Sequence, residues 1–159
     1  MHIVTASTSA PDEYRERLSP SLWTLLSAAV VAPMVALVFA PLVPTLALAV
    51  GVLAAVAFIA LLVLLSPVVA VRGGELLVGR AHIPVDLLGE PAALTGDGAR
   101  AARGPELSRT AWHLLRGGID PVVRIPVLDE GDPVTEWVFS TRAPDRVIAA
   151  IRRARSAST

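Results

Sequence analysis

The sequence has no cysteine and no lysine among its 159 residues. Without cysteine the chain has no disulfide, no thiolate metal ligand and no cysteine nucleophile. Its fourteen basic residues are all arginine and are balanced by fourteen acidic residues, so the formal net charge is zero. Because nucleic-acid-binding domains usually carry a basic excess, we expect no nucleic-acid partner.

Ionisable side chains are also absent from a long internal segment. From Leu18 to Val71 the chain has no Asp, Glu, Arg, Lys or His over 54 consecutive residues. A single membrane span needs about 20 apolar residues, so this segment is long enough for two. Pro41 and Pro44 mark the turn between them. The pattern predicts a transmembrane α-helical hairpin with spans at about 22–40 and 45–65.

Two features inside the predicted spans concern how the helices pack. Pro33 removes a backbone N–H donor from the first span and predicts a kink. The second span has a stripe of small residues that favours close helix approach, namely Gly51, Ala54, Ala55 and Ala57. Neither span contains an ionisable side chain, which pumps and ion pathways normally need, so we expect no transport by the hairpin alone. A cleaved signal sequence is the competing interpretation of the first span, but in "VFAPL" a proline directly follows the small residue.

Arginines on both sides of the hairpin predict its orientation. Arg15 and Arg17 precede the first span, Arg72 and Arg80 follow the second, and the connecting turn has no charge. By the positive-inside rule we expect a multi-pass protein of the cell membrane with both termini in the cytoplasm. The side chains predicted to anchor the chain at the membrane interface are Tyr14, Arg15, Arg17, Trp23 and Arg72.

Around the hairpin, at 22–66, the sequence predicts a cytoplasmic N-terminal tail at 1–21 and a cytoplasmic β-rich domain at 67–159. In the tail, the segment "PDEYRERL" is expected to be a short helical or interfacial lead-in. Ser19, followed by a proline, is expected to cap the first helix of the hairpin.

Alternating apolar residues predict strands in the β-rich domain. Gly73 and Gly74 predict a hairpin turn, and Pro126 predicts an edge strand or a bulge because it cannot donate a ladder hydrogen bond. Inward positions are predicted for Val123, Ile125, Val127, Trp137 and Phe139. An amphipathic C-terminal helix is predicted at about 144–155. Strands followed by one such helix indicate a small α+β domain, an antiparallel pleckstrin-homology-like fold.

Five short segments occur in a distinctive order along the chain: "YRERL" before the hairpin, then "GGEL", "LGE", "RGPE", and "FSTRAPD" before the last helix. From Asp12 onward this arrangement resembles an uncharacterised family of alanine-rich two-span membrane proteins from actinobacteria, classified as a domain of unknown function. The resemblance implies a membrane location and a β-rich cytoplasmic tail. It implies no catalytic residue.

None of the residues that could carry chemistry lies in a motif for it. The histidines lack the spacing of a zinc site, the acidic turn lacks the ligand order of a calcium loop, and the hydroxyls lack a nucleophile elbow. These residues are His2, His82, His113, Ser108, Thr110, Asp129, Glu130 and Asp132. We therefore expect no enzyme activity, no cofactor or metal, and no small-molecule substrate.

The C-terminal helix offers the most distinctive candidate surface, because it concentrates arginines. Each basic residue near an anionic leaflet contributes about 1 kcal/mol to membrane binding, although arginines there also solvate a helix and complement its dipole. The candidate contacts for anionic lipid or a partner are Arg142, Arg146, Arg152, Arg153 and Arg155. One hypothesis is a membrane-tethered module that binds protein or anionic lipid. The alternative is an accessory or assembly subunit of a larger membrane complex, whose hairpin contacts a membrane protein or a second copy of the chain.

Overall fold

The computed structural model describes residues 13–42 and 44–158. They form two compact units. The hairpin unit runs from Ser19 to Pro67, and the β-rich unit combines the segments that end at Leu18 and begin at Val68. Residues 1–12 of the predicted N-terminal tail lie outside the described residues.

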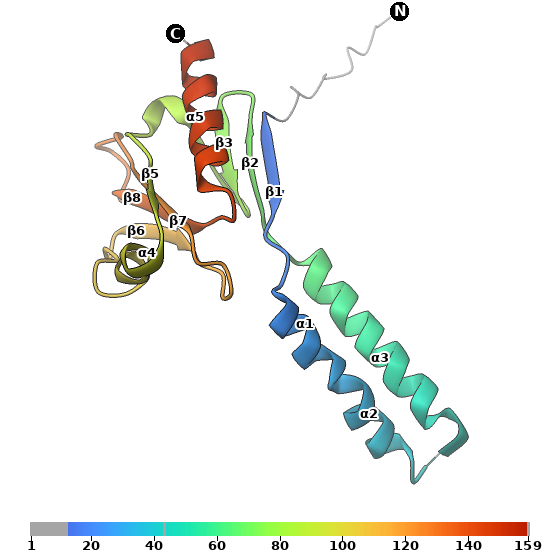
Figure 1. Ribbon diagram of the computed structural model, residues 1–159. Coiled ribbons are helices and arrows are strands. Elements are labelled where there is room, and N and C mark those ends of the chain that lie inside the picture. The colour runs from blue at the N-terminus through green and yellow to red at the C-terminus, as the bar shows by residue number, and fades with distance from the viewer. Residues whose placement is uncertain (1–12, 43, 159) are drawn as a thin grey trace, which may run out of the picture. The chain divides into compact units, whose positions relative to one another are not determined.

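The hairpin unit contains three helices, in which α1 (Leu22–Ala29) and α2 (Val31–Phe39) follow one another and pack against α3 (Pro44–Leu64) (Figure 1). Leu22–Phe39 and Thr45–Leu64 are each long and apolar enough to cross a membrane. Only 6% and 17% of these two segments are buried, which is unlike the core helix of a water-soluble domain. Their bounds agree with the predicted spans to within one residue.

The first apolar segment is interrupted at Val30, between α1 and α2. Pro33 lies in the first turn of α2, where its ring would clash with the carbonyl four residues earlier. The helix is therefore interrupted three residues before the proline, and a kink at this point stays a prediction. The start of α1 differs from the prediction: the Ser21 hydroxyl accepts a hydrogen bond from the Thr24 backbone N–H at 3.3 Å, so Ser21 is the cap instead of Ser19.

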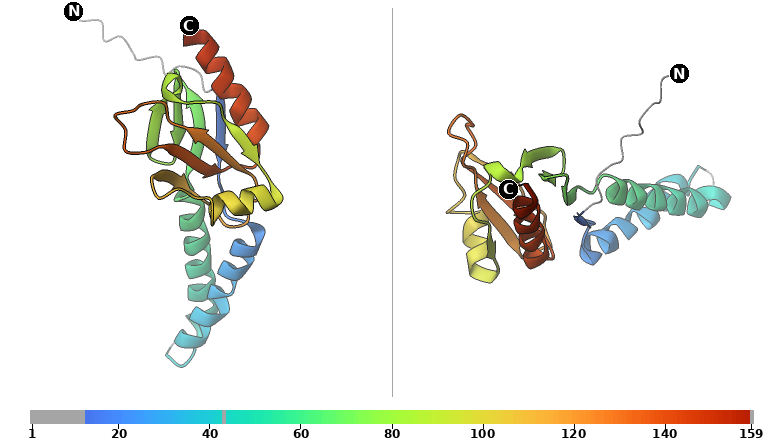
Figure 2. Two further views of the ribbon diagram at one scale, coloured as in Figure 1. Left: turned by 90° about the vertical axis from the view of Figure 1, so that its left-hand side faces the viewer. Right: turned by 90° about the horizontal axis from the view of Figure 1, so that it is seen from above.

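The helices α2 and α3 lie side by side in both views of Figure 2 and approach closely at Gly51. A Cβ atom added to Gly51 would lie 2.3 Å from the backbone oxygen of Ala32, so the contact requires glycine. Ala47 and Ala55, one turn to either side, are buried at 5% and 6% exposure. The predicted small-residue stripe is thus confirmed at Gly51 and Ala55, whereas Ala57 is exposed.

The first sheet of the β-rich unit is antiparallel, with its strands in chain order. Its strands are β1 (Tyr14–Arg17), β2 (Val68–Arg72), β3 (Glu75–Val78) and β4 (Ala81–Pro84). The hairpin unit is inserted between β1 and β2, whose ends at Arg17 and Val68 lie opposite each other in the sheet. The helical form of the predicted lead-in is therefore wrong, because its described part forms β1, whereas an interfacial position stays a prediction. The turn predicted at Gly73 and Gly74 is confirmed between β2 and β3, with positive φ at both glycines.

The second sheet has the order β5-β7-β8-β6. Its strands are β5 (Ala92–Leu94), β6 (Ala111–Leu114), β7 (Val122–Pro126) and β8 (Glu136–Ser140). The strands β6 and β8 are parallel and the other pairs are antiparallel. Three helical elements complete the unit, namely the 3-10 helix η1 (Val85–Leu87), α4 (Gly96–Arg103) and α5 (Pro144–Ser158).

The predicted fold class is confirmed in its coarse form: two apolar helices, antiparallel strand pairs and a C-terminal helix. It departs from the prediction in detail, because β6 and β8 are parallel and β1 comes before the hairpin. The pleckstrin-homology-like fold stays a prediction.

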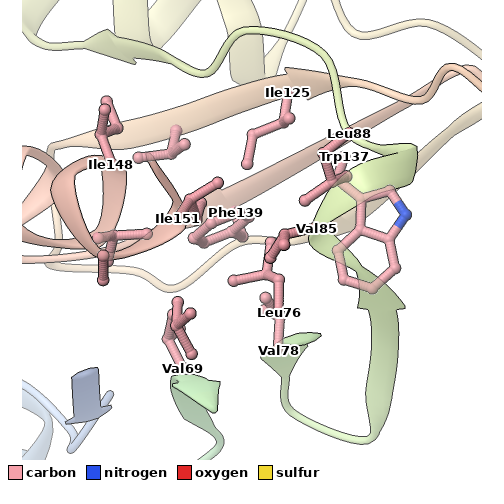
Figure 3. Close-up of a cluster of buried hydrophobic side chains, with 14 of the residues drawn as sticks. Val69, Leu76, Val78, Val85, Leu88, Ile125, Trp137, Phe139, Ile148 and Ile151 are labelled. Carbon is pink, nitrogen blue, oxygen red and sulfur yellow. The ribbon is translucent and has the colours of Figure 1, made fainter. Parts of the chain in front are cut away.

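The main core lies between the first sheet, the second sheet and α5 (Figure 3). Val69 and Leu76 reach it from the first sheet, Ile125 and Phe139 from the second, and Ile151 from α5, all fully buried. Burying a side chain of this size contributes about 1.5–3 kcal/mol. A smaller cluster on the other side of the second sheet packs α4 against β7 and β8 through Ala99, Val122 and Val138.

Pro126 ends a strand that lies inside its sheet, so the predicted edge position is wrong. The next residue, Val127, donates its N–H to Thr135 next to β8 at 2.9 Å. Neighbouring residues of a strand direct their amides to opposite sides, so a donor at Pro126 would point away from β8. On that side β5 pairs only as far as Arg124, and the Pro126 carbonyl accepts a hydrogen bond from Gly89. The strand therefore tolerates a proline at its last residue.

Candidate functional site

The five arginines predicted to form one surface at the C-terminal helix are divided by the fold. Arg152 pairs with Glu90, with its Nε 3.0 Å from Oε1. Arg155 donates from Nη2 to the backbone oxygens of Leu88 and Gly89 at 2.8 and 2.9 Å. These two side chains bind α5 to the connection between η1 and β5. Their guanidinium groups therefore already have partners within the protein.

The other three arginines have different surroundings. Arg142 precedes α5 and donates from Nη1 to the backbone oxygen of Arg17 at 3.4 Å. Arg146 and Arg153 are exposed on α5. They are seven residues apart and therefore share one side of the helix. Lipid or partner contact by these arginines stays a prediction, but the structure does not collect all five on one surface.

A carboxylate on β1 joins the first sheet to the start of α5. Glu16 accepts hydrogen bonds from the hydroxyls of Tyr14 and Thr141 and from the backbone N–H of Arg142, the last at 2.8 Å. Burial, and after it the hydrogen bond to Glu16, raise the pKa of Tyr14 from 10.0 to about 12. Tyr14 also packs against the main core. The Tyr14 side chain thus packs and hydrogen-bonds within the β-rich unit, although the sequence predicted it as a membrane-interface anchor.

The outward side of the first sheet carries a second basic surface, which the sequence analysis did not identify as a unit. The period of two along β1 places Tyr14 and Glu16 inward and Arg15 and Arg17 outward. The register aligns Arg15 with Ala70 of β2, which in turn lies opposite Leu77 of β3. We call this surface the basic face, formed by Arg15, Arg17, Val68, Ala70, Leu77 and His82, together with the exposed Arg80 in the turn at its end.

Charge is unevenly distributed along this side of the sheet. Arg17 lies at the end next to Val68, where the chain leaves for the hairpin and returns. Arg80 is at the same end, in the turn after Gly79, whose N–H donates to the Val68 carbonyl at 2.8 Å. The outward carboxylate of Glu75 lies at the opposite end, where it faces Arg72 across the β2–β3 pair. The end that is joined to the hairpin is therefore the cationic one.

A shallow hollow of about 210 Å³ opens on the outward side of the first sheet. Its lining combines two guanidinium groups with apolar side chains: Arg15, Val68, Ala70, Arg72, Leu77 and Gly79. Cationic groups around an apolar floor suit an amphipathic ligand better than a fully polar one. Of the predicted interface anchors, Arg15, Arg17 and Arg72 share this outward side, while Trp23 is exposed at 76% on α1.

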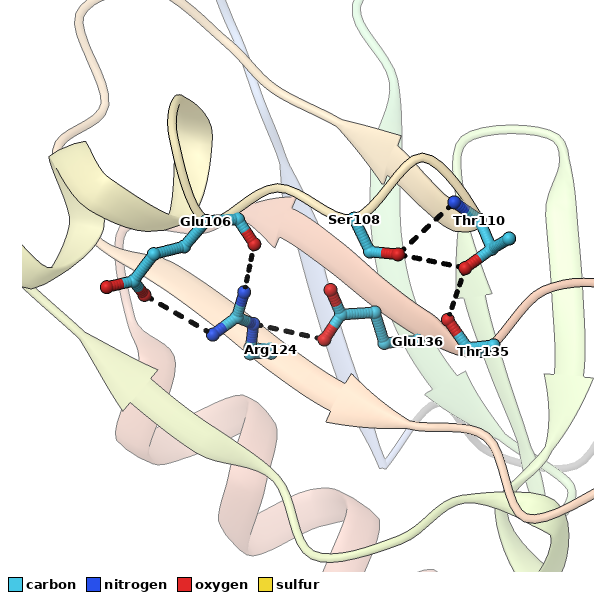
Figure 4. A network of polar contacts seen from close by, with 6 residues as sticks. All are labelled: Glu106, Ser108, Thr110, Arg124, Thr135 and Glu136. Carbon is cyan, nitrogen blue, oxygen red and sulfur yellow. Dashed lines mark hydrogen bonds and ion pairs between the residues drawn. The ribbon is translucent and has the colours of Figure 1, made fainter.

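A third polar cluster lies on the second sheet and has a structural role (Figure 4). Arg124 donates from Nη2 to the Glu106 carbonyl at 2.7 Å, and its Nε lies 3.1 Å from the Glu136 carboxylate. Beside it a chain of hydroxyl contacts links Ser108, Thr110 and Thr135. Arg124 is half-buried among these groups, which hold the segment after α4 against the sheet.

The remaining residues considered for chemistry are scattered. His82 and His113 are exposed on different sheets, and His2 lies outside the described residues. In the acidic turn, the carboxylates of Asp129 and Asp132 accept backbone N–H bonds within the turn at 2.9 and 2.8 Å. Across residues 13–42 and 44–158, no three His, Cys, Asp or Glu side chains converge in a way that would hold a metal ion.

These features define a class of protein: a β-rich unit with an apolar helical hairpin inserted after its first strand. The chain belongs to the family described as "Protein of unknown function (DUF3093)", whose model matches residues 13–151. The predicted membership of an uncharacterised family is thereby confirmed. No curated protein and no solved structure matches the chain.

Proposed function

We propose that the protein is an integral membrane protein whose hairpin unit tethers the β-rich unit to the cytoplasmic side of the cell membrane as an interaction module. The observation that carries this proposal is the outward exposure of large apolar side chains on all three helices. Leu22, Leu37 and Leu53 are exposed at 85%, 73% and 70%. Exposed apolar surface of this extent is unfavourable in water and favourable in lipid.

The orientation is supported by the arginines. Arg15 and Arg17 on β1 and Arg72 on β2 flank the hairpin, whereas the turn at Pro41 and Leu42 is uncharged. Because short basic flanks are retained in the cytoplasm, both sides of the β-rich unit belong there. The pairing of β1 with β2 is consistent with this topology, since it requires both flanks to be in the same compartment.

The alternative, an accessory subunit that binds its partner through the hairpin, has lost part of its motivation. It rested on the small-residue stripe of the second span and on Pro33 in the first. Gly51 and Ala55 of that stripe are buried inside the hairpin unit, where Gly51 contacts Ala32. The β-rich unit, with its exposed arginines, is therefore the better candidate for partner contact.

The absence of cysteine allows a clean test of the topology. One variant carries Leu42→Cys in the turn, and its matched control carries Ser156→Cys on α5; both positions are exposed. In intact cells a membrane-impermeant maleimide should label Leu42→Cys but not Ser156→Cys, which should react only after permeabilisation. Labelling of Ser156→Cys in intact cells, or release of the protein by alkaline carbonate, would overturn the proposal.

A further inference from the structure

We infer that the basic face binds the headgroups of anionic phospholipids in the leaflet to which the hairpin is anchored. This inference rests on the proposed function, because it requires the hairpin to lie in a bilayer. It adds the surface that makes the contact and the class of ligand. The residues that carry it are Arg15, Arg17 and Arg80, with Val68 and Leu77 between their strands.

The first argument is covalent reach. Arg17 is five residues from the start of α1 at Leu22, and Val68 is four residues from the end of α3 at Leu64. A chain extends by at most about 3.3–3.6 Å per residue, so these connections reach no further than about 18 and 14 Å. The cationic end of the first sheet is therefore kept near the membrane surface whatever the orientation of the unit.

The second argument is charge complementarity. Arg15, Arg17 and Arg80 are all exposed. The outward carboxylate of Glu75 lies at the far end of the sheet, roughly 10–13 Å along the strands, at about 3.3 Å per residue. Glu13 lies on the same outward side at that far end, two residues before Arg15. A Debye length at physiological ionic strength is about 8 Å, so Arg17 and Arg80 at the near end are screened from both carboxylates, whereas Arg15 is close to Glu13. A basic residue near an anionic leaflet raises membrane affinity about fivefold.

The third argument distinguishes a lipid from a soluble anion. Val68 and Leu77 are only partly buried on the outward side, so the arginines surround apolar surface. The hollow there is shallow and its guanidinium groups come from separate strands. Arginine stems and half-exposed aliphatic side chains suit the boundary between headgroups and acyl chains. Because the hairpin tethers the basic face to the membrane, the effective lipid concentration is high enough for a surface with low intrinsic affinity to bind.

The test uses the full-length protein in nanodiscs, with a polarity-sensitive fluorophore on His82→Cys in the basic face and, as control, on Ser156→Cys. Spin-labelled lipid quenches a fluorophore that approaches the bilayer. When phosphatidylglycerol replaces part of the phosphatidylcholine, quenching at position 82 should rise at least about twofold. It should fall again at high salt, and quenching at position 156 should stay unchanged. Equal quenching in both lipids would overturn the inference.

Two charge-matched triple variants identify the surface. R15Q/R17Q/R80Q should abolish the rise in quenching, whereas R100Q/R109Q/R116Q removes the same charge elsewhere and should keep it. R15K/R17K/R80K, which preserves the charge, should retain at least about half of the response, and this variant guards against loss of folding in the glutamine variant. If the second set abolishes quenching while the first does not, or if lysine fails to rescue it, the inference is wrong.

Competition separates the lipid from other anions. Inorganic phosphate or an acidic peptide, added to nanodiscs of phosphatidylglycerol, should leave quenching at position 82 unchanged at matched ionic strength. Displacement by either would assign the basic face to a soluble ligand or a protein and overturn the lipid assignment. If the protein fails to enter nanodiscs at all, the proposed function fails; if it enters and position 82 does not respond, only the present inference fails.

Discussion

The two units of this protein bury opposite kinds of side chain. In the β-rich unit the large apolar residues, such as Phe139 and Leu76, are inside and the arginines are outside. In the hairpin unit the contact between helices is made by small residues such as Gly51, and large residues such as Leu53 point outward. In water the hydrophobic effect drives large side chains inward. In lipid that driving force is absent between helices, and close backbone packing takes its place. The contrast is the one expected if, as proposed, the hairpin unit lies in lipid and the β-rich unit in water.

The largest expected effect contrasts the same substitution in the two units. Phe139→Ala should lower the free energy of unfolding of the β-rich unit by about 3–5 kcal/mol, because it leaves a cavity in the main core. Phe58→Ala, at a position on α3 that is 41% exposed, should cost less than about 1 kcal/mol. Denaturant unfolding of the detergent-solubilised protein measures both, with near-ultraviolet circular dichroism of the Trp112–Trp137 pair for the β-rich unit and far-ultraviolet circular dichroism for the hairpin helices. Similar losses in the two variants would contradict the contrast.

The next prediction tests which solvent surrounds the hairpin. Leu53→Arg places a charge near the middle of α3 and should cost about 2.5–3.5 kcal/mol in membrane insertion. Leu128→Arg, at a position exposed at 60% in the β-rich unit, should leave insertion unchanged. The fraction of protein that resists alkaline carbonate extraction reports the difference. If Leu53→Arg stays fully membrane-bound, or makes the protein more soluble without loss of structure, lipid is not the solvent of α3.

A smaller effect is expected at the closest approach of the helices. Gly51→Ala should destabilise the hairpin by about 1–3 kcal/mol, because the new Cβ would push the backbones of α2 and α3 apart. Gly117→Ala is the matched control, since nothing lies within 4 Å of its added Cβ. The sodium dodecyl sulfate concentration at which the protein becomes protease-sensitive should fall for Gly51→Ala alone. An unchanged midpoint would show that the helices do not pack at Gly51.

The smallest prediction concerns pH and the strand that adjoins the hairpin. The pKa of Tyr14 is raised from 10.0 to about 12 in the folded protein. Between these values the unfolded chain releases the phenol proton while the folded protein keeps it, so stability should decrease as pH rises from about 10 to about 12. Below pH 10 both states are protonated and this dependence disappears. Tyr14 is the only tyrosine, so the ultraviolet absorbance of its phenolate measures the pKa directly. Tyr14→Phe should remove this decrease in stability, and a titration near 10 in the folded protein would contradict the prediction.

Local patterns were sufficient for several elements of the fold. The charge-free segment gave both apolar helices within one residue, and alternation placed Val123, Ile125, Trp137 and Phe139 inward on β7 and β8. These features depend on the contrast between polar and apolar residues along a few helical turns or one strand. That contrast is visible in the local sequence. The two-glycine turn between β2 and β3 is equally local, because few other residues adopt positive φ.

Errors arose where a residue's role depends on a distant partner. The segment Tyr14–Arg17 is too short for its sequence pattern to predict a strand. It forms one because it pairs with Val68–Arg72, which follows the hairpin in the chain. Pro126 was expected at an edge because its neighbours across the sheet were unknown. The arginines of α5 looked alike in sequence, but Arg152 meets Glu90 and Arg155 meets two carbonyls from the segment after η1.

The sequence by itself determined that one segment of this chain is apolar and has no ionisable residue, and that strands elsewhere alternate between polar and apolar residues. Those properties follow from side-chain chemistry and hold in any conformation. Only the tertiary structure decided that β1 pairs with β2 although the hairpin separates them in the chain, that Glu16 joins β1 to α5, and that Arg15, Arg17 and Arg72 share one side of the first sheet. The reason is that strand pairing brings together residues more than fifty positions apart, and no local pattern records which partners they meet.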